Sequence, residues 1–236
     1  MTITILRPSQ RVIHIPGIGV RISGRAVSAG GNWWEAGGGT CLAAYQPKGA
    51  ASYAASRSNV ASPGTNNLAE LGVAPGWNTA VGYTPSGAGN DLLDTGIAPA
   101  DPTGYSLFAQ ITGATSANLR VTVAGALNAT YRGIGVFCSY GNQDAARYYC
   151  NTSAAQAPSL TAGNLGIAGS QGYRNGIADG AAGGVFSGAA GPSIWLLSIN
   201  LNGIAWGAFH GNLVALAIYS DTVPDPLSLA TAMAAL

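Results

Sequence analysis

The second half of the chain is built of short runs that alternate apolar and polar residues, with turn residues between them at fairly even intervals. Alternation with a period of two is typical of half-buried strands. Asn175-Gly176 and Asn202-Gly203 are strong hairpin signals, because both positions of such a turn tolerate a positive φ. This pattern favours an antiparallel sandwich or jelly roll over βαβ units. Strands are predicted at 105–112, 119–124, 131–140, 145–151, 165–170, 172–178, 193–200, 204–209 and 213–219.

The last residues change to a helical period. Asp225 can cap a helix, and Pro226 suits its first position because that position needs no backbone N–H donor. The pattern therefore predicts a short C-terminal helix with one apolar face. The residues on that face are Leu227, Ala230, Met233 and Ala234.

Residues 1–35 differ from the rest and form a predicted N-terminal β-arm, followed by a body over 36–236. Segments 2–6, 11–15 and 18–22 alternate like strands, and 29–32 reads as a hinge. Three short strands without a large core are marginal alone, so we expect them to pair with the body or with another subunit.

The arm is basic. Its arginines precede the first acidic residue, Glu35, and either an acidic partner surface or nucleic acid would attract such a charge. Because they alternate with Ile and Val, we interpret them instead as the solvated or interface face of strands. The candidates for anchoring the protein to a larger particle are Arg7, Arg11, Arg21 and Arg25.

Charged residues make up only 8% of the chain, against roughly 25% in an ordinary domain. So few charges do little to keep a monomer in solution, and we expect neighbouring subunits to cover much of the surface. A surface coated with Ser, Thr, Asn and Gly is the alternative. The net charge of +1 predicts no general attraction to nucleic acid or membranes. The sequence shows neither a secretory signal nor an apolar run of about 20 residues, so no membrane insertion is expected.

Several segments carry a family resemblance. They run from Cys41-Leu-Ala-Ala-Tyr45-Gln-Pro-Lys48 to Tyr53, from Asn59 to Asn66, from Gly76 to Tyr83 and from Leu92 to Ile97. Together with the Tyr173-Arg174-Asn175-Gly176 hairpin and the strand ending at Tyr219, they resemble the concanavalin A-like (laminin G-like) jelly-roll domain of tailed-bacteriophage structural proteins. The resemblance covers roughly residues 36–236. It implies an all-β, antiparallel jelly-roll sandwich.

The same resemblance implies a function. We expect a non-enzymatic virion structural protein, either a capsid decoration or a short fibre or tail component, made in the cytoplasm of the bacterial host. By analogy with phage fibres, it would be a homo-oligomer, a trimer, bound to other virion proteins such as the major capsid protein. The arm would attach by strand addition. The jelly roll would face outward and contact host-surface glycans.

The carboxylates are the first candidates for catalytic groups. Glycosidases of jelly-roll fold need two carboxylates that flank the scissile bond. Glu35 and Glu70 lie in loop-like segments, and Asp91 and Asp94 suit turn capping. No catalytic residue is therefore predicted, although a glycan-degrading enzyme with an unrecognised pair remains an alternative.

No cofactor or metal is predicted. His14 and His210 stand in no catalytic motif. Asp101 and Asn90 would supply, with the two aspartates above, only part of the six to eight oxygens that calcium requires. The cysteines form neither a disulfide framework nor a zinc pattern. Cys138 and Cys150 could face each other across a hairpin, but small buried thiols are the default expectation.

Two pairs of adjacent aromatic residues are candidates for glycan contact. Because neighbouring strand residues point to opposite faces, one member of each pair should face outward if the backbone is extended. The alternative is that the outward ring packs under a loop or in a subunit interface. A carbohydrate-binding adhesion module of a tail fibre is accordingly the alternative function. The candidates are Trp33, Trp34, Tyr148 and Tyr149, with Asn142, Gln143 and Asp144 beside them; Trp77, Trp195 and Trp206 are expected in the core.

Overall fold

The computed structural model describes residues 31–115, 121–139, 145–151, 153–182 and 191–236. The three arm segments and the anchoring candidates Arg7, Arg11, Arg21 and Arg25 lie outside these residues, as do His14 and the polar glycan candidates Asn142, Gln143 and Asp144. Among the described residues, no helix has both the length and the apolar character needed to cross a membrane.

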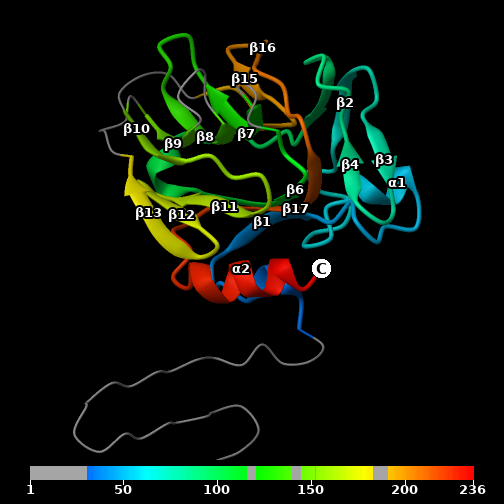
Figure 1. Cartoon of the computed structure of the whole chain (residues 1–236), viewed down its shortest axis with the longest axis horizontal. Coiled ribbons are helices and arrows are strands. Elements are labelled where there is room, and N and C mark those ends of the chain that lie inside the picture. The colour runs from blue at the N-terminus through cyan, green and yellow to red at the C-terminus, as the bar shows by residue number, and fades with distance from the viewer. Residues whose placement is uncertain (1–30, 116–120, 140–144, 152, 183–190) are drawn as a thin grey trace, which may run out of the picture.

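The described chain folds as a sandwich of two β-sheets, with a short helix packed outside one of them (Figure 1). In sheet A the strands run in the order β13-β12-β11-β6-β17-β4-β3, with β1 also paired to β17. These strands are β1 (Cys41–Tyr45), β3 (Gly76–Asn78), β4 (Gly82–Thr84), β6 (Ser106–Thr112), β11 (Gly163–Ala168), β12 (Gln171–Arg174), β13 (Ile177–Ala181) and β17 (Asn212–Tyr219).

Sheet B has the order β10-β9-β8-β7-β14-β5-β2. Strand β15 joins it parallel to β7, and β16 forms a hairpin with β15. The other described pairings of both sheets are antiparallel, so the predicted all-β sandwich is confirmed. The strands of sheet B are β2 (Ala69–Gly72), β5 (Asp91–Asp94), β7 (Val121–Leu127), β8 (Gly133–Ser139), β9 (Ala145–Cys150), β10 (Ser153–Pro158), β14 (Trp195–Leu196), β15 (Ile199–Leu201) and β16 (Ile204–Trp206).

The core lies between the sheets, and strand alternation explains which residues enter it. Along β6, Leu107, Ala109 and Ile111 face sheet B, whereas Phe108 faces the opposite side. Large side chains on both sheets fill the space, among them Tyr148, which is fully buried. Burial of this apolar surface supplies the main stabilisation of the sandwich.

The outer face of sheet A is covered by α2 (Pro226–Ala234) and by the 3-10 turn η1 (Trp33–Glu35) (Figure 1). The predicted cap is confirmed, because the Asp225 side chain accepts a hydrogen bond from Ser228 N–H at 3.0 Å. The apolar face is as predicted in part: Ala230 and Met233 are buried, but Leu229 is buried as well, whereas Leu227 is 55% exposed. Two further short helical segments are α1 (Tyr53–Ser56) and η2 (Pro102–Gly104).

Several predicted elements need correction. The predicted strand 172–178 is a hairpin, because Asn175 and Gly176 adopt φ of 49° and 77° between β12 and β13. The predicted strand 193–200 is broken between β14 and β15, where Leu197 has a φ of 69°. Strand β10 was not among the predicted strands.

Candidate functional site

The carboxylates considered for catalysis hold local structure. Asp91 accepts hydrogen bonds from the backbone N–H of Ser86 and, at 2.9 Å, from its hydroxyl. Asp94 accepts from Gly96 N–H at 2.9 Å. Both aspartates therefore fix the turns beside β5, as expected of residues that cap turns.

The two glutamates also make contacts with nearby side chains. Glu70 lies on β2 and forms an ion pair with Arg57 at 2.9 Å, and the Arg57 guanidinium lies 5.2 Å from the ring centroid of Tyr53. Glu35 ends η1 and accepts from the Asn32 side-chain amide at 2.9 Å. These contacts place Glu70 and Glu35 in separate clusters.

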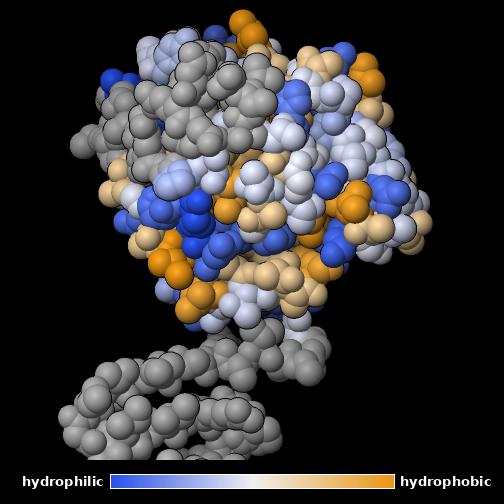
Figure 2. All heavy atoms as spheres, viewed as in Figure 1, coloured by the Kyte–Doolittle hydropathy of each residue, from blue (hydrophilic) through white to orange (hydrophobic). Residues whose placement is uncertain are grey.

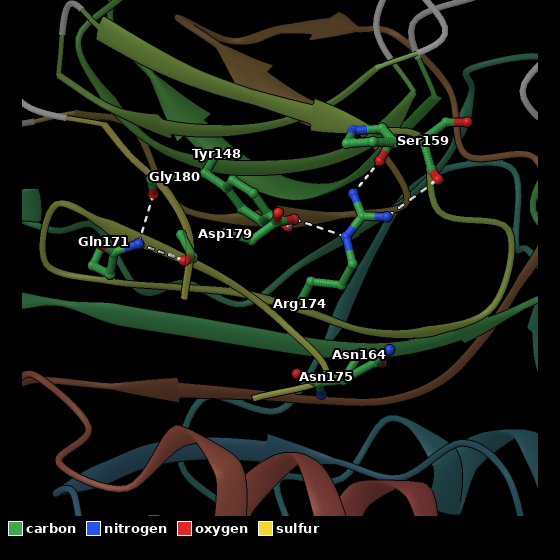
Figure 3. A network of polar contacts seen from close by, with 10 residues as sticks. Tyr148, Ser159, Asn164, Gln171, Arg174, Asn175, Asp179 and Gly180 are labelled. Atoms are coloured by element: carbon green, nitrogen blue, oxygen red, sulfur yellow. Dashed lines mark hydrogen bonds and ion pairs between the residues drawn. The ribbon is translucent and has the colours of Figure 1, made fainter. Parts of the chain in front are cut away.

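A polar network joins the two sheets at one edge of the sandwich (Figure 3). The Tyr148 hydroxyl, from β9 of sheet B, donates to Asp179 Oδ2 on β13 of sheet A at 2.7 Å. Arg174 Nε on β12 donates to the same oxygen at 2.7 Å. The rest of the Arg174 guanidinium donates to the backbone carbonyls of Pro158, the last residue of β10, and of Ser159 directly after it.

The chemistry of this network favours a structural role. Burial, reinforced by the hydrogen bond to Asp179, raises the pKa of Tyr148 well above its usual value. A phenol held in its protonated form is a donor, not an activated nucleophile. Its ring also packs against the backbone of Gly172, where a Cβ would overlap it. Tyr148 is therefore not accessible as the glycan contact that its sequence position suggested.

The tryptophan pair also lies elsewhere than expected. Trp33 and Trp34 are in a 3-10 turn, not an extended strand, and their rings meet edge to face at 5.6 Å. Trp33 is buried and its indole N–H donates to the Gln46 side chain at 3.0 Å. Trp34 packs in the same cluster, and its carbonyl accepts from the Tyr219 hydroxyl at 2.8 Å. The two tryptophans thus pack in the apolar cluster between sheet A and α2.

The outer face of sheet B carries a group of aromatic rings, here called the outer aromatic patch: Tyr131, Phe137, Tyr149 and Trp206. Tyr149 faces this side because Tyr148, its neighbour on β9, points into the core. Trp206 on β16 meets Phe137 at 5.7 Å and Tyr131 at 5.6 Å, both edge to face. Tyr131 is 46% exposed, whereas Trp206 and Tyr149 are half-buried.

Two members of this patch were missed at the sequence level. Trp206 was expected in the core, but it packs with Phe137 on the outer face, on the strand that pairs with β15 at the side of β7. Tyr131 was expected in a strand, yet it stands in the turn before β8 with a φ of 59°. Asn128, three residues earlier, was the available signal of that turn. Of the other two tryptophans, Trp195 is buried and Trp77 is half-buried.

The thiols offer no activated nucleophile. All three cysteines are free. Burial raises the pKa of Cys41 and Cys138 to about 12 and that of Cys150 to about 11, so the reactive thiolate is scarce at neutral pH. The His210 ring packs against the backbone at Gly87. Within the described ranges, no three of the residues His, Cys, Asp and Glu gather as a metal site would require.

The fold is similar to that of two solved structures of a Trypanosoma rangeli sialidase. One is in complex with 2,3-difluoro-KDN (12% identity, TM-score 0.56, 83% of this chain and 32% of that chain). The other is a covalent intermediate with 2,3-difluorosialic acid (12% identity, TM-score 0.57, 96% of this chain and 36% of that chain). The present chain thus spans about a third of the sialidase chains.

The fold is also similar to that of domain 4 of AbnA, a GH43 extracellular arabinanase from Geobacillus stearothermophilus, in complex with arabinotriose. The identity is 15% and the TM-score 0.54, over 81% of this chain and 98% of that domain. Comparison with models of protein families gave no match, and neither did comparison with curated protein sequences. At these identities the likenesses establish a shared β-sandwich fold.

Proposed function

We propose that this chain is a non-catalytic, carbohydrate-binding β-sandwich displayed by a bacteriophage virion. The observation that carries the carbohydrate part is the likeness to almost the whole of the AbnA domain, a unit of similar fold that was solved with arabinotriose bound. The similarity to part of a sialidase, a second glycan-active protein, points the same way. Because function does not follow from fold, the proposal requires a direct binding test.

The non-catalytic part of the proposal is supported by the roles of the reactive side chains. The four candidate carboxylates support turns or ion pairs, and the Tyr148 hydroxyl is kept protonated inside a network between the sheets. Retaining and inverting glycosidases need an acid and a base or nucleophile placed across one bond. Glu70 and Glu35, the two glutamates, contact different parts of the fold.

The binding test is a printed array of bacterial surface polysaccharides together with arabinotriose, probed with the folded protein. We expect saturable binding to at least one glycan, absent with heat-unfolded protein. Failure to bind any glycan would overturn the carbohydrate proposal. Products released from a bound glycan by wild-type protein, but not by Glu70→Gln or Asp91→Asn, would show that the chain is an enzyme.

The virion setting is supported by the sequence resemblance over segments 41–97 and by the scarcity of charged residues. In this setting the chain forms a homo-oligomer, a trimer by analogy, held on the major capsid protein or another virion protein by residues 1–35. Quantitative mass spectrometry of purified particles tests it. A copy number near that of the shell protein indicates a capsid decoration, a few copies indicate a fibre or tail component, and absence from particles overturns the setting.

The anchoring role of the arm has its own test. Removal of residues 1–30 should leave a folded body that no longer attaches to particles. Full occupancy by the truncated protein would show that the arm is not the anchor.

A further inference from the structure

We infer that the outer aromatic patch is the saccharide-binding surface of the domain, with the Tyr131 and Trp206 rings as its platform. This inference rests on the proposed carbohydrate-binding function and gives that function a location. The patch lies on the outer face of sheet B, and the β15–β16 hairpin that carries Trp206 is at the end of the molecule opposite α2 (Figure 1). On this hairpin the aliphatic Ile204 is 69% exposed, and isolated hydrophobic groups stand among paler and hydrophilic residues at that end of the molecule (Figure 2).

The backbone at Tyr131 is the first observation behind this assignment. Its φ of 59° lies in the left-handed region, which is unfavourable for a bulky L-residue and well tolerated by Gly and Asn. The turn holds this conformation through the Asn128 side chain, which accepts from Thr130 N–H and Arg132 N–H at 3.0 Å each. The chain thus keeps an exposed aromatic ring where stability alone favours a smaller residue. Strain retained in this way is typical of functional positions.

The second observation is the rigidity of the Trp206 side of the platform. The Asn200 side chain is buried, accepts from Gly203 N–H at 2.7 Å and donates to the Ser193 carbonyl at 3.0 Å. Ser198 Oγ donates to the Gly207 carbonyl at 2.6 Å, directly after β16. Fixed rings of this kind bind a ligand with little loss of conformational freedom.

The chemistry of the patch suits a sugar. A saccharide ring presents C–H groups on its faces and hydroxyls around its rim, so it needs an aromatic surface with polar groups beside it. Tyr131 offers an apolar ring with a hydroxyl at its tip. Arg147 lies on the same face of β9 as Tyr149 and pairs in register with Phe137, which places a hydrogen-bond donor next to the rings.

The decisive variant is Tyr131→Asn. Asn tolerates the left-handed conformation, so we expect an unchanged or higher melting temperature. We expect the Kd for the tightest-binding glycan of the array to rise at least about 10-fold. Tyr131→Phe keeps the ring and should retain most of the affinity. The matched control is Ile177→Asn, at an even more exposed apolar position on β13 of sheet A, which should leave the Kd unchanged.

A direct readout avoids reliance on affinity alone. In protein labelled with 5-fluorotryptophan, Trp206→Phe assigns the fluorine resonance of Trp206. Saturating glycan should shift this resonance but not that of the buried Trp33. If wild-type protein binds glycan while Tyr131→Asn binds it equally well, the location is wrong and the proposed function stands. If Tyr131→Asn instead changes only the sedimentation coefficient, the patch is a contact between copies of the chain. If no glycan binds the wild type, both fail.

Discussion

The hydroxyl of Tyr148 lies 2.7 Å from Oδ2 of Asp179, so this hydrogen bond links β9 of one sheet to β13, the edge strand of the other. Asp179 Oδ2 also accepts from Arg174, and the three side chains therefore act as one unit (Figure 3). Because they connect strands of different sheets, removing these contacts should lower the free energy of unfolding of the whole domain.

Tyr148→Phe tests this link. Phe fills the same space but removes the donor to a partly exposed carboxylate, so the free energy of unfolding should fall by about 1 kcal/mol. Urea denaturation of the variant and the wild type measures this difference in unfolding free energy. The control is Tyr131→Phe, at a surface ring, which should change stability by only a few tenths of a kcal/mol. Equal stability of Tyr148→Phe and wild type would contradict a stabilising role.

The buried tyrosines predict a loss of stability at high pH. Burial is the main cause that raises the pKa of Tyr45, Tyr83, Tyr148 and Tyr219 above the usual value near 10. The unfolded chain then releases these protons first as the pH rises, so their contribution is complete below pH 10 and declines above it. Each group contributes a slope of up to about 1.4 kcal/mol per pH unit.

Tyr83→Phe isolates one of these groups. Denaturant unfolding between pH 9 and pH 11 should give a shallower decline of the unfolding free energy than in the wild type. The Ser56 hydroxyl, which contacts Tyr83, keeps its bond to the Tyr53 carbonyl at 2.6 Å in this variant. Identical slopes in the two proteins would show that Tyr83 ionises in the native state.

Gly166 on β11 should tolerate no side chain. A Cβ there would overlap the ring of Phe108, its partner in register on β6. We expect Gly166→Ala to destabilise the protein by about 1–3 kcal/mol, because Phe108 must leave its position under α2. Gly104→Ala is the control, since a Cβ at Gly104 meets no atom within 4 Å. Thermal unfolding of the two variants separates overlap from a general effect of replacing glycine.

Two leucines of α2 test its packing on sheet A. Leu229 is fully buried and Leu227 is 55% exposed, so Leu229→Ala should cost about 2–5 kcal/mol and Leu227→Ala less than about 1 kcal/mol. Both changes replace Leu by Ala in the same helix, which cancels differences of helix propensity. Similar losses in the two variants would mean that the helix does not dock through Leu229.

The elements that local chemistry specifies were predictable. The Asn175-Gly176 and Asn202-Gly203 turns have the expected positive φ, and Asp225 caps the C-terminal helix. These features depend on a few neighbouring residues. The helix face was right for Ala230 and Met233 but wrong for Leu227, because the choice between Leu227 and Leu229 depends on where the distant sheet A lies.

The aromatic candidates show more clearly which features could not be predicted from the sequence. Tyr149 faces outward as strand alternation requires, but Trp33 and Trp34 lie in a 3-10 turn that docks on residues far along the chain. Trp206 reaches the outer face only because the break at Leu197 redirects the chain into a parallel pairing with β7. The sequence pattern of residues 193–206 does not specify this pairing with β7.

The pairing of the first described strand with the last has a mechanical consequence. Cys41 lies opposite Tyr219, and Thr40 N–H donates to Asp221 at 2.9 Å, so the start of β1 and the end of β17 lie side by side. Force applied between those ends would open the ladder one pair at a time. A load applied at the outer aromatic patch pulls on sheet B instead, and it reaches β1 only across the packed core, where many contacts must break together. We therefore expect the fold to resist a load that is transmitted across the two sheets better than a load that separates the start of β1 from the end of β17.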